Sequence, residues 1–239
     1  MGVLNDHFAV HLIELRRRLI VSFVAIAVCS VVAYFFAQPI TGFFVAPLFR
    51  AHAGMGKLVY TNLTEAFVAY FKIALLVGLI FSSPVLLYEL WMFVSPGLHR
   101  HERRLVLKIV GTATLLFVGG AAFAYFVVLP DALSFLMGFA SERLKALPKF
   151  DAYLTFMARS TLAFGLAFEV PFLMVAAHRT GLVSRDHFRK KRLYFYAAIV
   201  GLAFLLTVGD IFSAVLLALP LFGLYEAGLL VIRLFSSPA

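Results

Sequence analysis

Cysteine and charged residues are both scarce in this sequence. Only one of the 239 residues is a cysteine, Cys29, which excludes an intrachain disulfide and a cluster of thiolate metal ligands. Charged residues make up 14% of the chain and hydrophobic residues 63%, whereas soluble domains carry about 25% charged and roughly 45–50% apolar residues. This composition excludes an ordinary soluble domain and predicts an all-α integral membrane protein.

Groups of residues typical of enzymes are missing as well. All seven histidines lie outside the long apolar runs, and the sequence shows no HExxH motif, no Ser-His-Asp set and no intramembrane pair of aspartates. His99 and His101 flank Arg100, but two imidazoles without a third ligand are weak evidence for a metal. We therefore expect no enzyme activity and no cofactor. The net charge of +9 comes from short loops that flank apolar runs, which does not favour nucleic acid as a partner.

Long apolar runs recur along the chain and predict six membrane-spanning helices in a single domain over residues 1–239. Each run has about the 20 residues that cross a hydrocarbon core, or more, except the fifth, whose 15 residues reach only about 22 Å. The fifth helix is therefore expected to be short, and the sixth, which follows it after a tight turn, is expected to be short too. The predicted spans are 19–37, 66–90, 105–129, 152–177, 194–208 and 211–232.

The segments between these runs carry their own signals. Phe8, Leu12, Leu15 and Leu19 recur at helical spacing, which predicts an amphipathic helix at the membrane interface before the first span. Proline and glycine punctuate residues 38–65, so we expect a structured loop there that can contain short helical pieces. Pro130 is expected to end the third span.

Basic residues are distributed unevenly between the two sides of this arrangement. Fourteen Lys and Arg residues fall on the side of both termini, and six fall on the other. Because cytoplasmic loops carry the excess of positive charge, both termini are predicted to be cytoplasmic.

Glu169 is the residue that costs most free energy to bury in a membrane, because it lies deep in the fourth apolar run. An ionised carboxylate at the centre of a spanning helix costs a few kcal/mol. Glu169 is therefore either a functional residue or a structural one. As a structural residue it would be protonated and hydrogen-bonded to a neighbouring helix, or its charge would be neutralised by a basic group such as Arg159. As a functional residue it could also serve as the coupling carboxylate of a proton-coupled transporter for small solutes. Such transporters often have inverted repeats, and the two halves of this chain show no such correspondence.

Two further carboxylates lie among arginines on the predicted cytoplasmic side. Glu14 precedes Arg17 and Arg18 by three and four residues, a spacing that gives weak ion pairs on an exposed helix. Glu102 could simply favour the start of the third span. Each could be a solvated charge, yet together they offer places for an incoming guanidinium, which binds carboxylate in a bidentate fork.

Two acidic residues in the last third of the chain also have two readings. Asp210 lies in the short turn between the fifth and sixth runs, where it either shapes the turn and caps the next helix or contacts a partner. Glu226 lies near the cytoplasmic end of the sixth run, where its charge costs less. Both are candidates for a partner interface.

Six stretches, in order along nearly the whole chain, resemble the TatC family, the multi-spanning subunits of the twin-arginine protein translocase. They are HLIELRRRL (11–19), TEAFVAYFK (64–72), YELWMFVSPGLHRHERR (88–104), FAYFVVLP (123–130), FGLAFEVP (164–171) and LALPLFGLYE (217–226). The resemblance implies six spanning helices with both termini in the cytoplasm of a bacterial cell, and a concave hollow that opens to the membrane.

The resemblance also implies a site. In this family the N-terminal region and the first cytoplasmic loop recognise the paired arginines of a signal peptide on folded cargo. By resemblance, Glu14 and Glu102 contact those arginines, with Arg16 and Phe93 as supporting positions. Glu169 would face the hollow.

The remaining implications concern partners. The family works with single-span TatA- and TatB-type subunits and with further TatC copies in the bacterial inner membrane, and uses the proton gradient. Pro47 matches a structural proline. Thr207 matches a partner-docking position, but this chain reads Thr207-Val208-Gly209-Asp210 where the family usually reads TPPD. Ala214 stands where the family commonly has glutamine.

Overall fold

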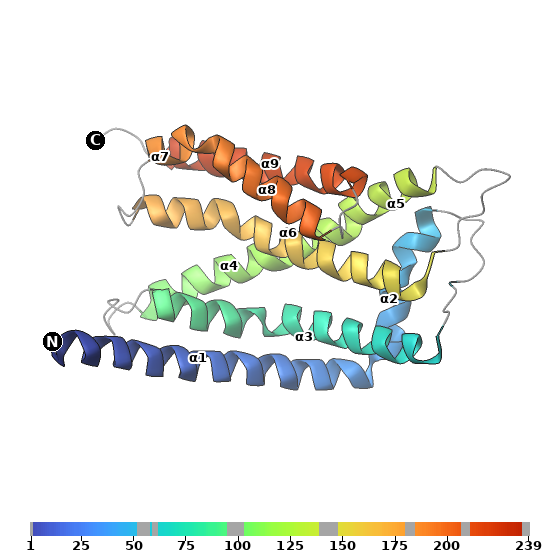
Figure 1. Cartoon of the computed structure of the whole chain (residues 1–239), viewed down its shortest axis with the longest axis horizontal. Helices are drawn as coiled ribbons and strands as arrows, with labels where there is room; N and C mark the ends of the chain where they lie inside the picture. Colours follow the sequence, from blue (N-terminus) through green and yellow to red (C-terminus); the bar gives the residue numbers. More distant parts are fainter. Residues whose placement is uncertain are drawn as a thin grey trace. The chain divides into compact units, whose positions relative to one another are not determined.

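The computed structural model describes residues 2–51, 58, 62–94, 103–138, 148–179, 185–206 and 211–235, and these are almost entirely helical. The α-helices are α1 (Gly2–Phe35), α2 (Ala37–Ala51), α3 (Leu63–Val94), α4 (Arg103–Phe123), α5 (Leu129–Met137), α6 (Phe150–Arg179), α7 (Arg185–Lys190), α8 (Arg192–Leu206) and α9 (Ile211–Phe235) (Figure 1). The all-α class is thus confirmed for this part of the chain.

Four stretches within the described residues are long and apolar enough to cross a membrane. They are His11–Phe35, Thr64–Phe93, Val106–Met137 and Phe150–His178. The apolar helix α8 has 15 residues, as the sequence predicts. The sixth predicted span was expected to be short too, and this was wrong, because α9 runs for 25 residues through Pro220. Six spans in total stay a prediction.

The predicted interfacial helix and the first predicted span are two parts of one helix. The 34-residue helix α1 continues through the expected boundary at residues 18–19. Neither proline nor glycine occurs between residues 3 and 35, so no residue there removes a helical hydrogen bond.

Residues 37–51 form the helix α2 of 15 residues, so this part of the expected loop over residues 38–65 is one continuous helix rather than a loop with short helical pieces. The helix persists although Pro47 lies inside it. Proline has no N–H, which leaves the carbonyl four residues earlier, that of Phe43, without its helical donor. The Tyr125 hydroxyl donates to that carbonyl at 2.6 Å, and the Tyr153 hydroxyl donates to the carbonyl of Phe44 at 2.7 Å. The Tyr125 hydroxyl from a distant segment therefore replaces the donor that Pro47 removes, and the Tyr153 hydroxyl adds a second contact to the same helix.

Pro130 does not end the third predicted span, and that expectation was also wrong. A π-helical turn, Ala124–Val128, follows α4 and leads directly into α5, where Pro130 lies in the first turn. Proline is tolerated in the first turn of a helix, because the N–H groups there have no partner in the same helix. The helical path consequently continues from Arg103 to Met137.

Pro84 lies inside α3, where it frees the carbonyl of Ile80. The Ser83 hydroxyl donates to that carbonyl at 2.7 Å, which keeps a long apolar helix intact. Asn62 precedes α3, and its backbone N–H donates to the carboxylate of Glu65 at 3.3 Å. This is the reciprocal half of a capping box, which stabilises the start of α3.

Contacts divide the chain into two compact units, Met1–Thr41 with Tyr70–Leu115, and Gly42–Ala69 with Leu116–Ala239. Within the first unit, α1 lies beside α3, and a Cβ built on Gly78 would come within 2.7 Å of the Ser30 backbone nitrogen. Within the second unit, α6 and α8 both pack against α9 around a buried apolar cluster that includes Phe164 and Leu217. The single domain over residues 1–239 stays a prediction.

Replacing Tyr125 by phenylalanine is expected to lower the melting temperature of the protein in detergent by a few degrees. The change leaves the Phe43 carbonyl, whose bond to Tyr125 is partly buried, without the tyrosine donor, and a polar group left unsatisfied costs about 1–3 kcal/mol when it is buried. In a Pro47→Ala background the loss should be smaller, since alanine at this position restores the helical N–H. Tyr194→Phe, at a 74% exposed tyrosine, is the control. Equal losses with proline and with alanine at position 47 would contradict this explanation.

Candidate functional site

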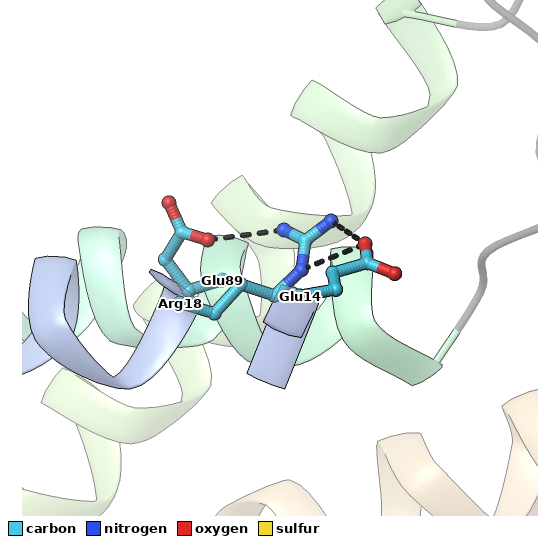
Figure 2. Close-up of polar contacts among 3 residues, drawn as sticks. All are labelled: Glu14, Arg18 and Glu89. Carbon is cyan, nitrogen blue, oxygen red and sulfur yellow. Dashed lines mark hydrogen bonds and ion pairs between the residues drawn. The ribbon is translucent and has the colours of Figure 1, made fainter. Parts of the chain in front are cut away.

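An arginine held between two carboxylates is the central feature of the first unit. The Arg18 Nη1 donates to Glu89 Oε2 at 3.0 Å, and the Arg18 Nε donates to Glu14 Oε1 at 3.1 Å. The Arg18 Nη2 also forms an ion pair with Glu14 Oε1. Figure 2 shows the guanidinium between the two acids, which it reaches through different nitrogens.

Helical spacing places these groups together. Glu14 and Arg18 are four residues apart on α1 and share one of its faces. His11, two turns before Arg18, stacks on Phe93 with ring centroids 4.4 Å apart and an interplanar angle of 16°. Phe93 lies four residues after Glu89 on α3. One face of α1 therefore meets one face of α3 at two points, an aromatic stack and an ion-pair cluster.

A cavity of about 400 Å³ opens beside this cluster. The side chain of Glu14 is 32% exposed, whereas those of Arg18 and Glu89 are 17% and 15% exposed. Glu14 is thus the outer acid and Glu89 the inner one. The cavity is lined by Glu14, Arg17, Arg18, Val21, Tyr88, Glu89 and Met92.

The predicted ion pair between Glu14 and Arg18 is therefore present, and Phe93 lies on the same two-helix face. Arg16 is exposed on α1. Glu102 lies outside the described residues, so the expected pairing of Glu14 with Glu102 stays a prediction. Glu89 was not predicted from the sequence, because its contact with Arg18 joins residues 71 positions apart.

Glu169 lies on α6 and is 5% exposed. Its Oε1 has no hydrogen-bond partner among the described residues. Arg159 precedes it by ten residues on the same continuous helix, which is about 15 Å along the axis, so that arginine does not neutralise it directly. A buried carboxylate oxygen without a partner is costly, and this is consistent with a functional residue.

Glu226 joins two helices at the end of the second unit. Its Oε2 accepts from Arg192 Nη2 at 3.0 Å, and its Oε1 accepts from the Tyr196 hydroxyl at 2.5 Å. The carboxylate of α9 therefore joins α9 to α8, a contact that was not predicted from the sequence. Thr207 and Asp210 lie outside the described residues. Ala214, by contrast, is buried in the apolar cluster of the second unit.

Several long apolar helices, with an arginine of one clamped between its own acid and an acid of another, define a polytopic helical membrane protein with a site suited to guanidinium groups. The described residues contain no cluster of three or more His, Cys, Asp or Glu side chains that could hold a metal ion. The chain belongs to the TatC family: the sequence model for "Sec-independent protein translocase protein (TatC)" matches residues 10–220.

Relatives cover nearly the whole chain. It is 41% identical to the Sec-independent protein translocase protein TatC of Desulforapulum autotrophicum, over 96% of this chain and 85% of that protein. It is 38% identical to TatC of Escherichia coli K12, over 94% and 87% of the two chains, and 37% identical to TatC of Aquifex aeolicus, over 90% of each.

A solved structure described as the twin-arginine translocase receptor TatC matches the fold. The TM-score is 0.87 at 35% identity, and the match covers 95% of this chain and 100% of the other. A second structure, of TatC in the detergent DDM, gives a TM-score of 0.84. These findings confirm the resemblance found in the sequence. The chain is accordingly a membrane-embedded protein of the Tat translocase family, and the comparisons give no support to the alternative of a small-solute transporter.

Proposed function

We propose that this chain is the receptor and scaffold subunit of a twin-arginine translocase, and that it binds the paired arginines of a signal peptide on folded cargo. One observation carries the proposal: Glu14, expected to take a signal arginine, already binds a guanidinium beside an open cavity. A carboxylate that accepts Arg18 can accept the same group from a peptide. The receptor named in the matched structure supports the same role.

Further parts of the proposal come from the family resemblance. The chain crosses a bacterial inner membrane six times with both termini in the cytoplasm, which places Glu14 and Glu102 on the cytoplasmic side. Arg16 and Phe93 support this site. Glu169 offers a polar group inside the membrane to a signal segment or a partner helix.

Partner subunits complete the assembly. Single-span TatA- and TatB-type proteins and other copies of this chain join it, and Thr207, Asp210 and Glu226 are proposed to lie at a partner interface. The proton gradient drives export, and the chain itself requires no covalent step. Because Glu226 also ties α9 to α8, a partner that binds there would meet both helices.

Photocrosslinking tests the proposed receptor site. A photoreactive phenylalanine analogue replaces Tyr88, which lines the cavity, or Phe71, a 54% exposed residue on the same helix about 25 Å away along the axis. We expect a twin-arginine peptide to crosslink at position 88 and a twin-lysine peptide to crosslink at least tenfold less. At position 71, crosslinking should not differ between the twin-arginine and the twin-lysine peptide. Equal crosslinking of the two peptides at position 88 would rule out this site.

A further inference from the structure

Arg18 is an internal occupant of the carboxylate that is proposed to bind a signal arginine. Its Nε and Nη2 both face Glu14 Oε1, which is the edge-on approach that a peptide guanidinium would use. An incoming arginine must therefore either share Glu14 with Arg18 or replace it. The second carboxylate of the cluster decides which outcome is favoured.

Glu89 holds Arg18 through a nitrogen that Glu14 does not use. The Nη1 of Arg18 donates to Glu89 Oε2 at 3.0 Å, so Arg18 can lose Glu14 and keep a charged partner. If Glu89 were absent, Arg18 would lose its second acid of the cluster when it leaves Glu14. Its enclosed guanidinium would then have neither Glu14 nor Glu89 as a partner, and an unpaired enclosed charge is costly. Glu89 lowers that cost.

Exposure and charge agree with an exchange of this kind. Arg18 and Glu89 are about equally enclosed and form the inner pair, while Glu14 is about twice as exposed as either. Glu14, Glu89 and Arg18 together hold two carboxylates and one guanidinium, a formal charge of −1 that one incoming arginine would balance. Binding of one peptide arginine at Glu14 while Glu89 retains Arg18 would give every guanidinium of the inner cluster an acid.

We propose that Glu89 is a positioning residue for signal-peptide recognition: it retains Arg18 when a signal arginine takes Glu14, and Arg18 is the competitor that the peptide displaces. This inference rests on the proposed function. Glu89 acts through Arg18 and does not itself contact the peptide. Its effect should therefore depend entirely on the presence of the arginine at position 18.

A double-mutant cycle tests this dependence. The affinity of a fluorescent twin-arginine peptide is measured on the full chain in lipid nanodiscs for the native protein, Glu89→Gln, Arg18→Gln and the double variant. We expect Glu89→Gln to weaken binding about five- to tenfold, since Arg18 then remains on Glu14, and Arg18→Gln to tighten it about threefold or more. The double variant should bind like Arg18→Gln. Arg18→Met, another uncharged side chain, provides a second background if Arg18→Gln does not fold.

The outcomes separate this inference from the proposed function. A loss from Glu89→Gln that persists in both uncharged backgrounds would mean that Glu89 acts on the peptide or the fold directly, and would overturn the proposal. No loss in the native background would overturn it too. If the native protein binds twin-arginine and twin-lysine peptides equally, the proposed function itself fails. Thermal unfolding of each variant checks that it is folded.

Discussion

Replacing Glu14 by glutamine is expected to weaken the binding of a twin-arginine signal peptide by about 10- to 100-fold. The substitution keeps the size of the side chain and removes its charge. A hydrogen bond to a charged group contributes about 1.5–3 kcal/mol, and about 1.4 kcal/mol corresponds to a factor of ten in affinity. The affinity of a fluorescent peptide for the protein in nanodiscs measures the effect.

The matched control is Glu226→Gln. Glu226 is also a carboxylate of intermediate exposure with an arginine partner, but it lies on α9 among the residues of the second unit. We expect this variant to keep the native affinity for the peptide. A Glu14→Gln protein that binds the peptide as tightly as the native one would contradict the proposed site, and so would an equal loss from Glu226→Gln.

The second large effect is expected from Gly120→Ala on α4. A Cβ at this position would lie 2.3 Å from the Phe164 carbonyl oxygen and 2.9 Å from the Phe164 carbonyl carbon. These are backbone atoms of α6, which cannot rotate away, so the two helices must move apart. Overpacking of this kind costs typically about 1–3 kcal/mol, and occasionally more. We expect a melting temperature several degrees lower and a smaller folded fraction on size-exclusion chromatography.

Gly119 provides a control one residue away on the same helix. A Cβ there would meet no atom within 4 Å, and alanine is favoured over glycine in a helix by roughly 0.5–1 kcal/mol. Gly119→Ala should therefore leave the melting temperature unchanged or raise it slightly. If the two alanine variants unfold at the same temperature, the close approach of α4 to Phe164 does not limit the size of the residue at position 120.

Hydrophobicity and helical spacing predict the long helices of this chain well, because both signals are local. The second and fourth predicted spans lie inside α3 and α6, and the spacing of Glu14 and Arg18 predicts their ion pair. The predictions that proline would end or prevent a helix failed at two places. The sequence near Pro47 gives no sign that the Tyr125 hydroxyl supplies the missing donor, and Pro130 is tolerated only because a new helical turn begins there.

The candidate site was predictable only in part for a related reason. Glu14 could be identified from its arginine neighbours and from the family resemblance. Glu89, in contrast, gains its role from a contact between two helices with Arg18, which is 71 residues away in sequence. No local pattern distinguishes Glu89 from an ordinary polar residue near the end of a span. The contact of Arg192 and Tyr196 with Glu226 was missed for the same reason.

Export of a folded reporter tests the central claim most directly. The gene for this chain is deleted from its source cells, and a reporter that folds in the cytoplasm is fused to a twin-arginine signal. The reporter should then remain inside the cells, and export should return when the native chain is supplied but remain strongly reduced with Glu14→Gln. Continued export of the reporter without this chain would contradict its assignment as the receptor of the translocase.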